Sequence, residues 1–220
     1  MNISVYSENT WSLEFADIFL LSIKNVLKIK EKCTIFVTGG KSAAAVYRVL
    51  ASASDFFLLR SVEIFLSDER LTGSSSVDSN YFSVMRNLFP MGIGPGFCFH
   101  QMYKYPEGHN KSVIRCQEEF PDHFDIGLLS VSDDGHIASI FPQANTMHDL
   151  SGRIALAKST NHPYERLTIT PKVLSETDLI FALAVGVKKK WVIDRILDAT
   201  QVDPSLPATL LLNAKWIISR

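Results

Sequence analysis

The sequence has few cysteines and no excess of charge of either sign. Only three of its 220 residues are cysteines, and Cys33, Cys98 and Cys116 are widely spaced. This odd number favours neither a disulfide framework nor a zinc site with paired ligands, so a reducing compartment fits best. The formal net charge is -1, whereas nucleic acids and anionic membranes select clustered lysine and arginine in excess. We therefore expect no nucleic acid and no membrane as a partner.

The chain also lacks a long uninterrupted apolar run. The most apolar N-terminal stretch, residues 11–30, is broken by Glu14, Asp17 and three lysines, which is too many charges for a membrane span. The N-terminal sequence has no basic segment followed by a small-residue cleavage site, so we expect no signal peptide. We expect a cytoplasmic protein. The apolar residues of this stretch recur at spacings of three and four, which predicts an amphipathic helix on a core; they are Phe15, Phe19, Ile23, Val26 and Leu27.

What the sequence does contain is an ordinary globular composition, with 46% hydrophobic and 20% charged residues. At this length we expect one α/β domain over residues 1–220, and by default a monomer. Short β-rich runs alternate with helical stretches, which predicts a largely parallel sheet flanked by helices. The predicted strands are Thr34–Val37, Val62–Leu66, Phe97–Gln101, Phe124–Leu129, Leu167–Ile169, Leu179–Val185 and Trp216–Ser219. The other predicted helices are Ser42–Ala53, Ser79–Leu88, Lys111–Phe120 and Lys188–Ala199.

Two glycines follow the first predicted strand, in Thr38-Gly39-Gly40-Lys41-Ser42. Ligands of open parallel sheets gather at the carboxyl ends of the strands. Glycines there let the backbone approach an anion, and the amides of the next helix can donate to phosphate oxygens. The alternative is a tight turn that binds nothing. The spacing does not match a Walker loop.

Three charges, Asp68-Glu69-Arg70, end the apolar run VEIFL. Because burying charges is costly, these side chains must be solvated, paired or used. A solvated loop is the alternative to a functional role. Asp78, a few residues on, is predicted to cap the following helix.

One histidine stands out, in Ser132-Asp133-Asp134-Gly135-His136 at the end of the strand Phe124–Leu129. Asp134 could hold one ring nitrogen of His136 while the other faces a substrate, which makes His136 the best candidate for a general base. The other histidines have no comparable neighbours and receive no role; they are His100, His109, His123, His148 and His162.

Two cations also lie near predicted strand ends. Arg166 precedes the strand Leu167–Ile169, and Lys189 follows Gly186. Each could bind a phosphate, arginine in bidentate fashion and lysine as a point charge. Lysines at an exposed helix start are the alternative, but the helix dipole disfavours them there, so a bound anion would explain the cluster.

Together these segments resemble the 6-phosphogluconolactonase family. The resemblance is collinear from about Ile35 to the C-terminus and is specific through the order and spacing of its motifs. The matching segments are Thr38-Gly39-Gly40, Asp68-Glu69-Arg70, Asp78-Ser79-Asn80-Tyr81, Asp134-Gly135-His136-Ile137-Ala138-Ser139-Ile140-Phe141-Pro142, Arg166-Leu167-Thr168-Ile169-Thr170, Gly186-Val187-Lys188-Lys189 and Pro207-Ala208-Thr209-Leu210-Leu211.

The resemblance implies a modified Rossmann-like fold, shared with glucosamine-6-phosphate deaminase and ribose-5-phosphate isomerase. It also implies hydrolysis of 6-phosphogluconolactone to 6-phosphogluconate in the oxidative pentose phosphate pathway, with a sugar phosphate as the partner and no metal or cofactor. The implied catalytic residues are His136, which takes a proton from the attacking water, Asp134, which orients His136, and Arg70, which stabilises charge or positions the lactone. The implied substrate-binding residues are Gly39, Gly40, Lys41, Ser42, Asp68, Arg166 and Lys189.

The chain departs from the family pattern at three places. Ser130 and Ser132 stand where glycines are usual, and we expect them to add bulk and to restrict positive φ. Lys41-Ser42-Ala43 and Ile137 are the other departures.

Two alternatives stay open. The segment Asp134-Gly135-His136-Ile137-Ala138 also resembles the deaminase, although the next residues, Ser139-Ile140-Phe141-Pro142, supply no carboxylate for chemistry at C2. The second alternative is a sugar-phosphate-binding relative that has lost turnover.

Overall fold

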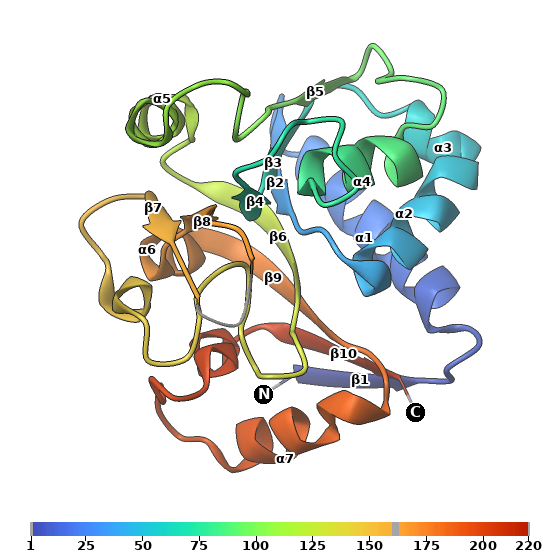
Figure 1. Cartoon of the computed structure of the whole chain (residues 1–220). Coiled ribbons are helices and arrows are strands. Elements are labelled where there is room, and N and C mark those ends of the chain that lie inside the picture. Colours follow the sequence, from blue (N-terminus) through green and yellow to red (C-terminus); the bar gives the residue numbers. More distant parts are fainter. Residues whose placement is uncertain (1, 160–162, 220) are drawn as a thin grey trace.

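The computed structural model describes residues 2–159 and 163–219, and they contain a seven-stranded sheet beside a three-stranded sheet (Figure 1). All neighbours in the large sheet, in the order β1-β10-β9-β6-β2-β3-β5, are parallel. The predicted parallel sheet is therefore confirmed. Its strands are β1 (Asn2–Tyr6), β2 (Cys33–Val37), β3 (Val62–Leu66), β5 (Phe97–Phe99), β6 (Phe124–Ser130), β9 (Thr177–Ala184) and β10 (Lys215–Ser219).

Helices lie on both sides of this sheet, with α1 to α4 together on the right in Figure 1. The five predicted helices are present, with ends shifted by up to three residues. The last of them begins as the 3₁₀ turn η2 and continues as α7. The helices are α1 (Trp11–Leu27), α2 (Lys41–Ser52), α3 (Ser54–Phe57), α4 (Asn80–Leu88), α5 (His109–Glu119), α6 (Pro171–Ser175) and α7 (Lys190–Asp198), and the 3₁₀ turns are η1 (Asn145–His148), η2 (Val187–Lys189) and η3 (Pro207–Leu211).

The core forms where α1 packs on the sheet. Phe15, Phe19 and Ile23 are buried, as their spacing predicts. The ring centroids of Phe15 and Phe19 lie 5.2 and 6.0 Å from that of Phe181 on β9. Aromatic edge-to-face pairs of this kind favour one packing arrangement over others. Within residues 2–159 and 163–219, no helix has the length and apolar character that crossing a bilayer requires.

The small antiparallel sheet was not predicted. It has the order β4-β8-β7, formed by β4 (Asp68–Arg70), β8 (Arg166–Ile169) and β7 (Ile154–Ala157). The three charged residues of β4 gave no strand signal, yet they pair with β8 in a register that sets Arg70 opposite Arg166. The solvated-loop alternative for this segment is therefore wrong, and pairing brings two distant charged segments together.

The predicted cap of α4 is also wrong. Ser79, rather than Asp78, precedes the first helical residue, and its hydroxyl accepts a hydrogen bond of 3.1 Å from the backbone N–H of Phe82. The Asp78 carboxylate instead accepts a hydrogen bond of 2.9 Å from the Tyr164 hydroxyl. One residue of shift in the helix start decides between the two candidate caps.

The chain reverses its direction of travel across the sheet between β2 and β6. From β2 it proceeds to β3 and β5 on one side, and from β6 to β9 and β10 on the other. Ligands of open α/β sheets bind where strand order reverses, outside the carboxyl ends of the strands. The fold therefore places its site at the ends of β2, β3, β6 and β9.

Candidate active site

A cavity of about 450 Å³ lies at these strand ends. It is within the size range of small-molecule sites in proteins. Every residue to which a catalytic or binding role was assigned lines it: Gly39, Gly40, Lys41, Ser42, Asp68, Arg70, Asp134, His136, Arg166 and Lys189. Among the histidines without a role, His162 lies outside the described residues.

Asp134 holds the imidazole of His136 in the cavity wall. Nδ1 of His136 lies 2.6 Å from Oδ1 of Asp134. Burial works against ionisation of Asp134, but the hydrogen bond and charge of His136 outweigh it and lower the pKa of Asp134 to about 2. An ionised carboxylate only accepts hydrogen bonds, so Nδ1 carries a proton, and in the tautomer that this sets Nε2 is the proton acceptor. This is the form that a general base requires.

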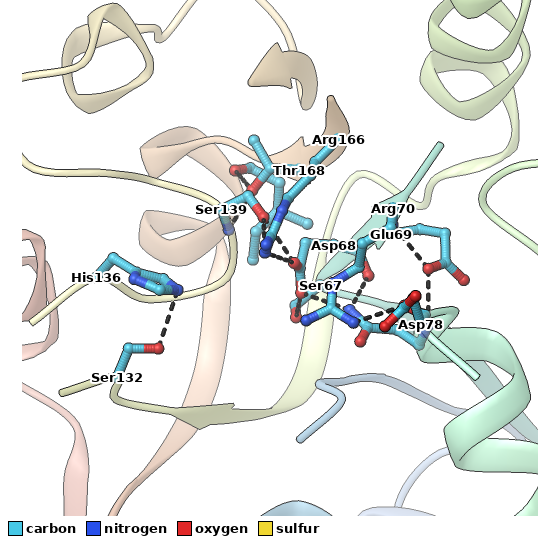
Figure 2. A network of polar contacts seen from close by, with 12 residues as sticks. Ser67, Asp68, Glu69, Arg70, Asp78, Ser132, His136, Ser139, Arg166 and Thr168 are labelled. Carbon is cyan, nitrogen blue, oxygen red and sulfur yellow. Dashed lines mark hydrogen bonds and ion pairs between the residues drawn. The ribbon is translucent and has the colours of Figure 1, made fainter. Parts of the chain in front are cut away.

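Ser132 contacts the other ring nitrogen. Its hydroxyl oxygen lies 2.9 Å from Nε2 of His136 (Figure 2). Given the tautomer set by Asp134, the hydroxyl donates and Nε2 accepts. Positive φ among the described non-glycine residues occurs only at Ser61, Ala138 and Gln143. The expectation that Ser130 and Ser132 restrict a positive φ is therefore wrong, because the backbone needs none there.

A second polar cluster surrounds Asp68 (Figure 2). One carboxylate oxygen accepts a 2.7 Å hydrogen bond from the Ser139 hydroxyl and lies 3.7 Å from a terminal nitrogen of Arg166. The other accepts from Ser67 and Asn80 at 3.2 and 3.1 Å. Asp68 and Arg166 are both at least 95% buried. The carboxylate is thus fully engaged, and its structural work is to hold Arg166 in the wall.

Arg70 and Arg166 place two positive charges in this wall, and Asp68 balances that of Arg166. They face each other across β4 and β8, and like charges opposite one another repel unless an anion compensates. Burial lowers the pKa of Arg166, and the charge of Asp68 opposes that shift. Among the described residues, neither arginine Nε finds a hydrogen-bond partner, although both atoms are buried.

Glu69 points away from the cavity and organises the start of α4. Its carboxylate accepts hydrogen bonds of 2.7 to 2.9 Å from the backbone of Arg70, Asn80 and Tyr81 and from the hydroxyl of Ser79. Burial raises the pKa of Glu69, against the lowering effect of these four donors. The second charge of the Asp68-Glu69-Arg70 motif is therefore structural.

The glycine loop, Thr38-Gly39-Gly40-Lys41-Ser42, has a backbone that leaves no room for a side chain at Gly39. A side chain on Gly39 would place its Cβ 2.0 Å from Oδ1 of Asn80. Gly40, the residue before α2, has a φ of 93°, which L-residues with side chains rarely adopt. The Tyr47 hydroxyl donates a 2.6 Å hydrogen bond to the carbonyl of Thr38 and so anchors the loop. The N-terminus of α2 is thereby directed at the cavity, where its amides can bind an anion.

Lys189 is the one member of the lysine cluster that lines the cavity. Lys188 is exposed, and Lys190 pairs with Asp194 at 2.7 Å. Burial lowers the pKa of Lys189, and the charge of Asp133 opposes that shift. A half-buried ammonium in a cavity is stabilised by an anion, in agreement with the phosphate prediction.

Three residues of the site received no role from the sequence. Asn80 donates to Asp68, Ser139 links Asp68 to Arg166, and Ser132 contacts His136. All three lie in the matching motifs or at a departure from them. Their contacts span distant segments or depend on a turn, so spacing alone carried no signal for them.

Comparison with known proteins finds similarity along nearly the whole chain. The family model described as glucosamine-6-phosphate isomerases/6-phosphogluconolactonase matches residues 7–218. The 6-phosphogluconolactonase of Caulobacter vibrioides is 31% identical over 80% of this chain and 76% of its own length. That of Thermotoga maritima superposes with a TM-score of 0.86 at 23% identity, covering 100% of this chain and 99% of the other. A monomeric glucosamine-6-phosphate deaminase superposes with a TM-score of 0.83 at 17% identity, covering 100% and 98%.

Proposed function

The chain belongs to the glucosamine-6-phosphate isomerases/6-phosphogluconolactonase family, and on this premise we propose that it hydrolyses 6-phospho-D-glucono-1,5-lactone to 6-phosphogluconate. The observation that carries the proposal is the pairing of Asp134 with His136 in a cavity that is also lined by the glycine loop and by four cationic side chains, those of Lys41, Arg70, Arg166 and Lys189. A base and a phosphate-binding wall in one cavity are what a phosphorylated lactone requires.

His136 acts as the general base in this proposal. Nε2 takes a proton from the water whose oxygen becomes part of the product carboxylate, and Asp134 stabilises the imidazolium that forms. The water can attack the lactone itself or an ester derived from it, and both routes need the same base. Arg70 lies in the same cavity and can stabilise the negative charge that develops on the carbonyl oxygen.

The phosphate would bind away from the reacting carbonyl. Gly39, Gly40, Lys41 and Ser42 supply amides and a charge at the start of α2, and Arg166 and Lys189 supply further cations. Binding energy from a remote phosphate orients the reacting carbon against the base. Asp68 contributes by fixing Arg166.

The carboxylates of the site disfavour the deaminase alternative. Proton transfer at C2 of an amino sugar needs an available carboxylate; of the three that line the cavity, Asp68 has both oxygens engaged, Asp134 is bound to His136, and the charge of Asp133 acts on Lys189. Ser139 stands in the segment where a further carboxylate would be needed, and its hydroxyl donates to Asp68.

The test is to supply freshly generated 6-phosphogluconolactone and to measure 6-phosphogluconate formation, beside ammonia release from glucosamine-6-phosphate. We expect rapid lactone hydrolysis and no ammonia. A lactone that disappears no faster than in buffer means that the proposal is wrong, and ammonia release in its place would identify a deaminase. Tight binding of 6-phosphogluconate without turnover would identify a non-catalytic relative.

A further inference from the structure

A continuous series of hydrogen bonds joins Ser132, His136 and Asp134 just beyond the C-terminal end of β6. The hydroxyl of Ser132 lies 2.9 Å from Nε2, and Nδ1 lies 2.6 Å from the Asp134 carboxylate. A nucleophile and base within 2.6–3.2 Å of each other, with the base oriented by a third group, is the arrangement of a Ser-His-Asp hydrolase. We propose that Ser132 is a nucleophile, so that the lactone opens onto its hydroxyl and forms an acyl-serine ester before water completes hydrolysis.

The turn that carries these residues fixes their relative positions. The backbone N–H of Ser132 donates to the carbonyl of His136 at 3.0 Å, and the N–H of Gly135 donates to the carbonyl of Ser132 at 3.0 Å. Gly135 has a φ of 82°, and a Cβ there would lie 2.3 Å from a methyl carbon of Leu206. The indole N–H of Trp191 donates to the carbonyl of Asp133 at 3.0 Å. These hydrogen bonds and contacts fix the turn, and with it the position of the Ser132 hydroxyl beside the imidazole of His136.

The position of the hydroxyl favours serine over water as the first nucleophile. The single lone pair of Nε2 accepts the Ser132 proton, so a water must displace this hydroxyl before it can use the base. Ser132 is half-buried and lines the same cavity as the phosphate-binding residues. A lactone held by its phosphate can therefore reach both the hydroxyl and the base.

The proposed steps balance without any co-reactant beyond water. Oγ of Ser132 bonds to C1 of the lactone while its proton passes to Nε2. The bond from C1 to the ring oxygen breaks, and that oxygen takes the proton from Nε2 and becomes a hydroxyl. Esterified Ser132 has no proton to donate, so Nε2 is then able to accept one from water. The water attacks C1, and Oγ leaves with the proton held by the imidazole.

This inference rests on the proposed lactonase function, and a chemical probe separates the two. A fluorophosphonate bonds through phosphorus to an activated serine and releases fluoride. We expect stoichiometric modification of Ser132 in the full chain, mapped by peptide mass spectrometry, and protection by 6-phosphogluconate. Ser130→Ala, which removes another hydroxyl at the cavity, should still be modified, whereas His136→Ala should not.

The outcomes are distinct. Protein that hydrolyses the lactone but is not modified at Ser132 overturns the nucleophile and keeps the function. Protein that is modified at Ser132 but does not hydrolyse the lactone overturns the function and keeps the nucleophile. Absence of both overturns both.

Substitution of Ser132 gives the second test. Ser132→Ala should lower kcat about a thousandfold or more with little change in KM, and thermal unfolding checks that the variant is folded. A residue that merely positions His136 would leave the fluorophosphonate without a target in the native protein. A folded Ser132→Ala protein that keeps kcat within about tenfold of the wild-type value also overturns the proposal.

Discussion

Oδ1 of Asp134 and Nδ1 of His136 lie 2.6 Å apart, two residues from each other in the chain. The contact ties the protonation of one side chain to the position of the other. Since hydrogen bonding and charge from His136, working against burial, lower the pKa of Asp134 to about 2, the pair also links the stability of the fold to pH.

The first prediction concerns acid stability. An Asp pKa of about 4 in the unfolded chain and about 2 in the folded chain stabilises the fold above about pH 4, and this contribution is lost as pH falls towards 2. Asp134→Asn should therefore be less stable than the wild type near neutral pH, and the difference should shrink between about pH 4 and pH 2. Urea unfolding at a series of pH values measures it. A difference that stays constant or widens on acidification contradicts the assignment.

The second prediction concerns the glycine loop. Gly39→Ala should displace Asn80, because the added Cβ would lie 2.0 Å from its Oδ1 and Asn80 is hydrogen-bonded to Asp68. We expect a loss of about 1–3 kcal/mol in the free energy of unfolding and a marked rise in KM. Gly73→Ala is the matched control, since it has open space and no positive φ. Equal KM values for the two variants would show that the loop does not need this close approach.

The third prediction concerns the buried carboxylate behind the site. Glu69→Gln replaces an oxygen that accepts two hydrogen bonds by an amide group that donates. We expect a loss of about 1–3 kcal/mol in unfolding free energy, because buried donors at the start of α4 lose their acceptor. Glu118→Gln, on the exposed side of α5, is the control. If both variants unfold at the wild-type denaturant concentration, Glu69 does not organise α4.

The fourth prediction separates neighbouring lysines. Lys189→Ala should raise KM for the lactone about tenfold or more and leave kcat largely unchanged, as expected for a group that binds the phosphate in both ground and transition states. Lys188→Ala, which changes an exposed lysine of the same turn, should leave both constants near the wild-type values. Steady-state kinetics on freshly generated lactone compare them, and matching KM values would remove Lys189 from the phosphate site.

Much of the site could be predicted because its residues directly follow apolar strands. The runs VEIFL and FDIGLL end abruptly in polar or charged segments, and parallel neighbours bring these ends to one edge. The small sheet could not be predicted, because the three charged residues of β4 become a strand only through pairing with β8. Local propensity carries no information about such a distant partner.

The contact between Ser132 and His136 could not be predicted from the sequence either. The sequence has two serines where the family usually has glycines, and from this we expected added bulk and a restricted backbone φ. The structure shows instead a turn closed by Gly135 that brings the hydroxyl of Ser132 to Nε2. A turn of this kind depends on one residue at positive φ and on packing against Leu206, neither of which spacing reveals.

Whether His136 is the base of a lactone hydrolase is decided by comparing the wild type and His136→Ala with freshly generated 6-phosphogluconolactone at saturation. We predict that 6-phosphogluconate formation by the wild type far exceeds the rate in buffer, and that kcat of the variant falls about 10²- to 10⁴-fold with KM nearly unchanged. A folded His136→Ala protein that turns the lactone over at the wild-type rate would show that His136 is not the base.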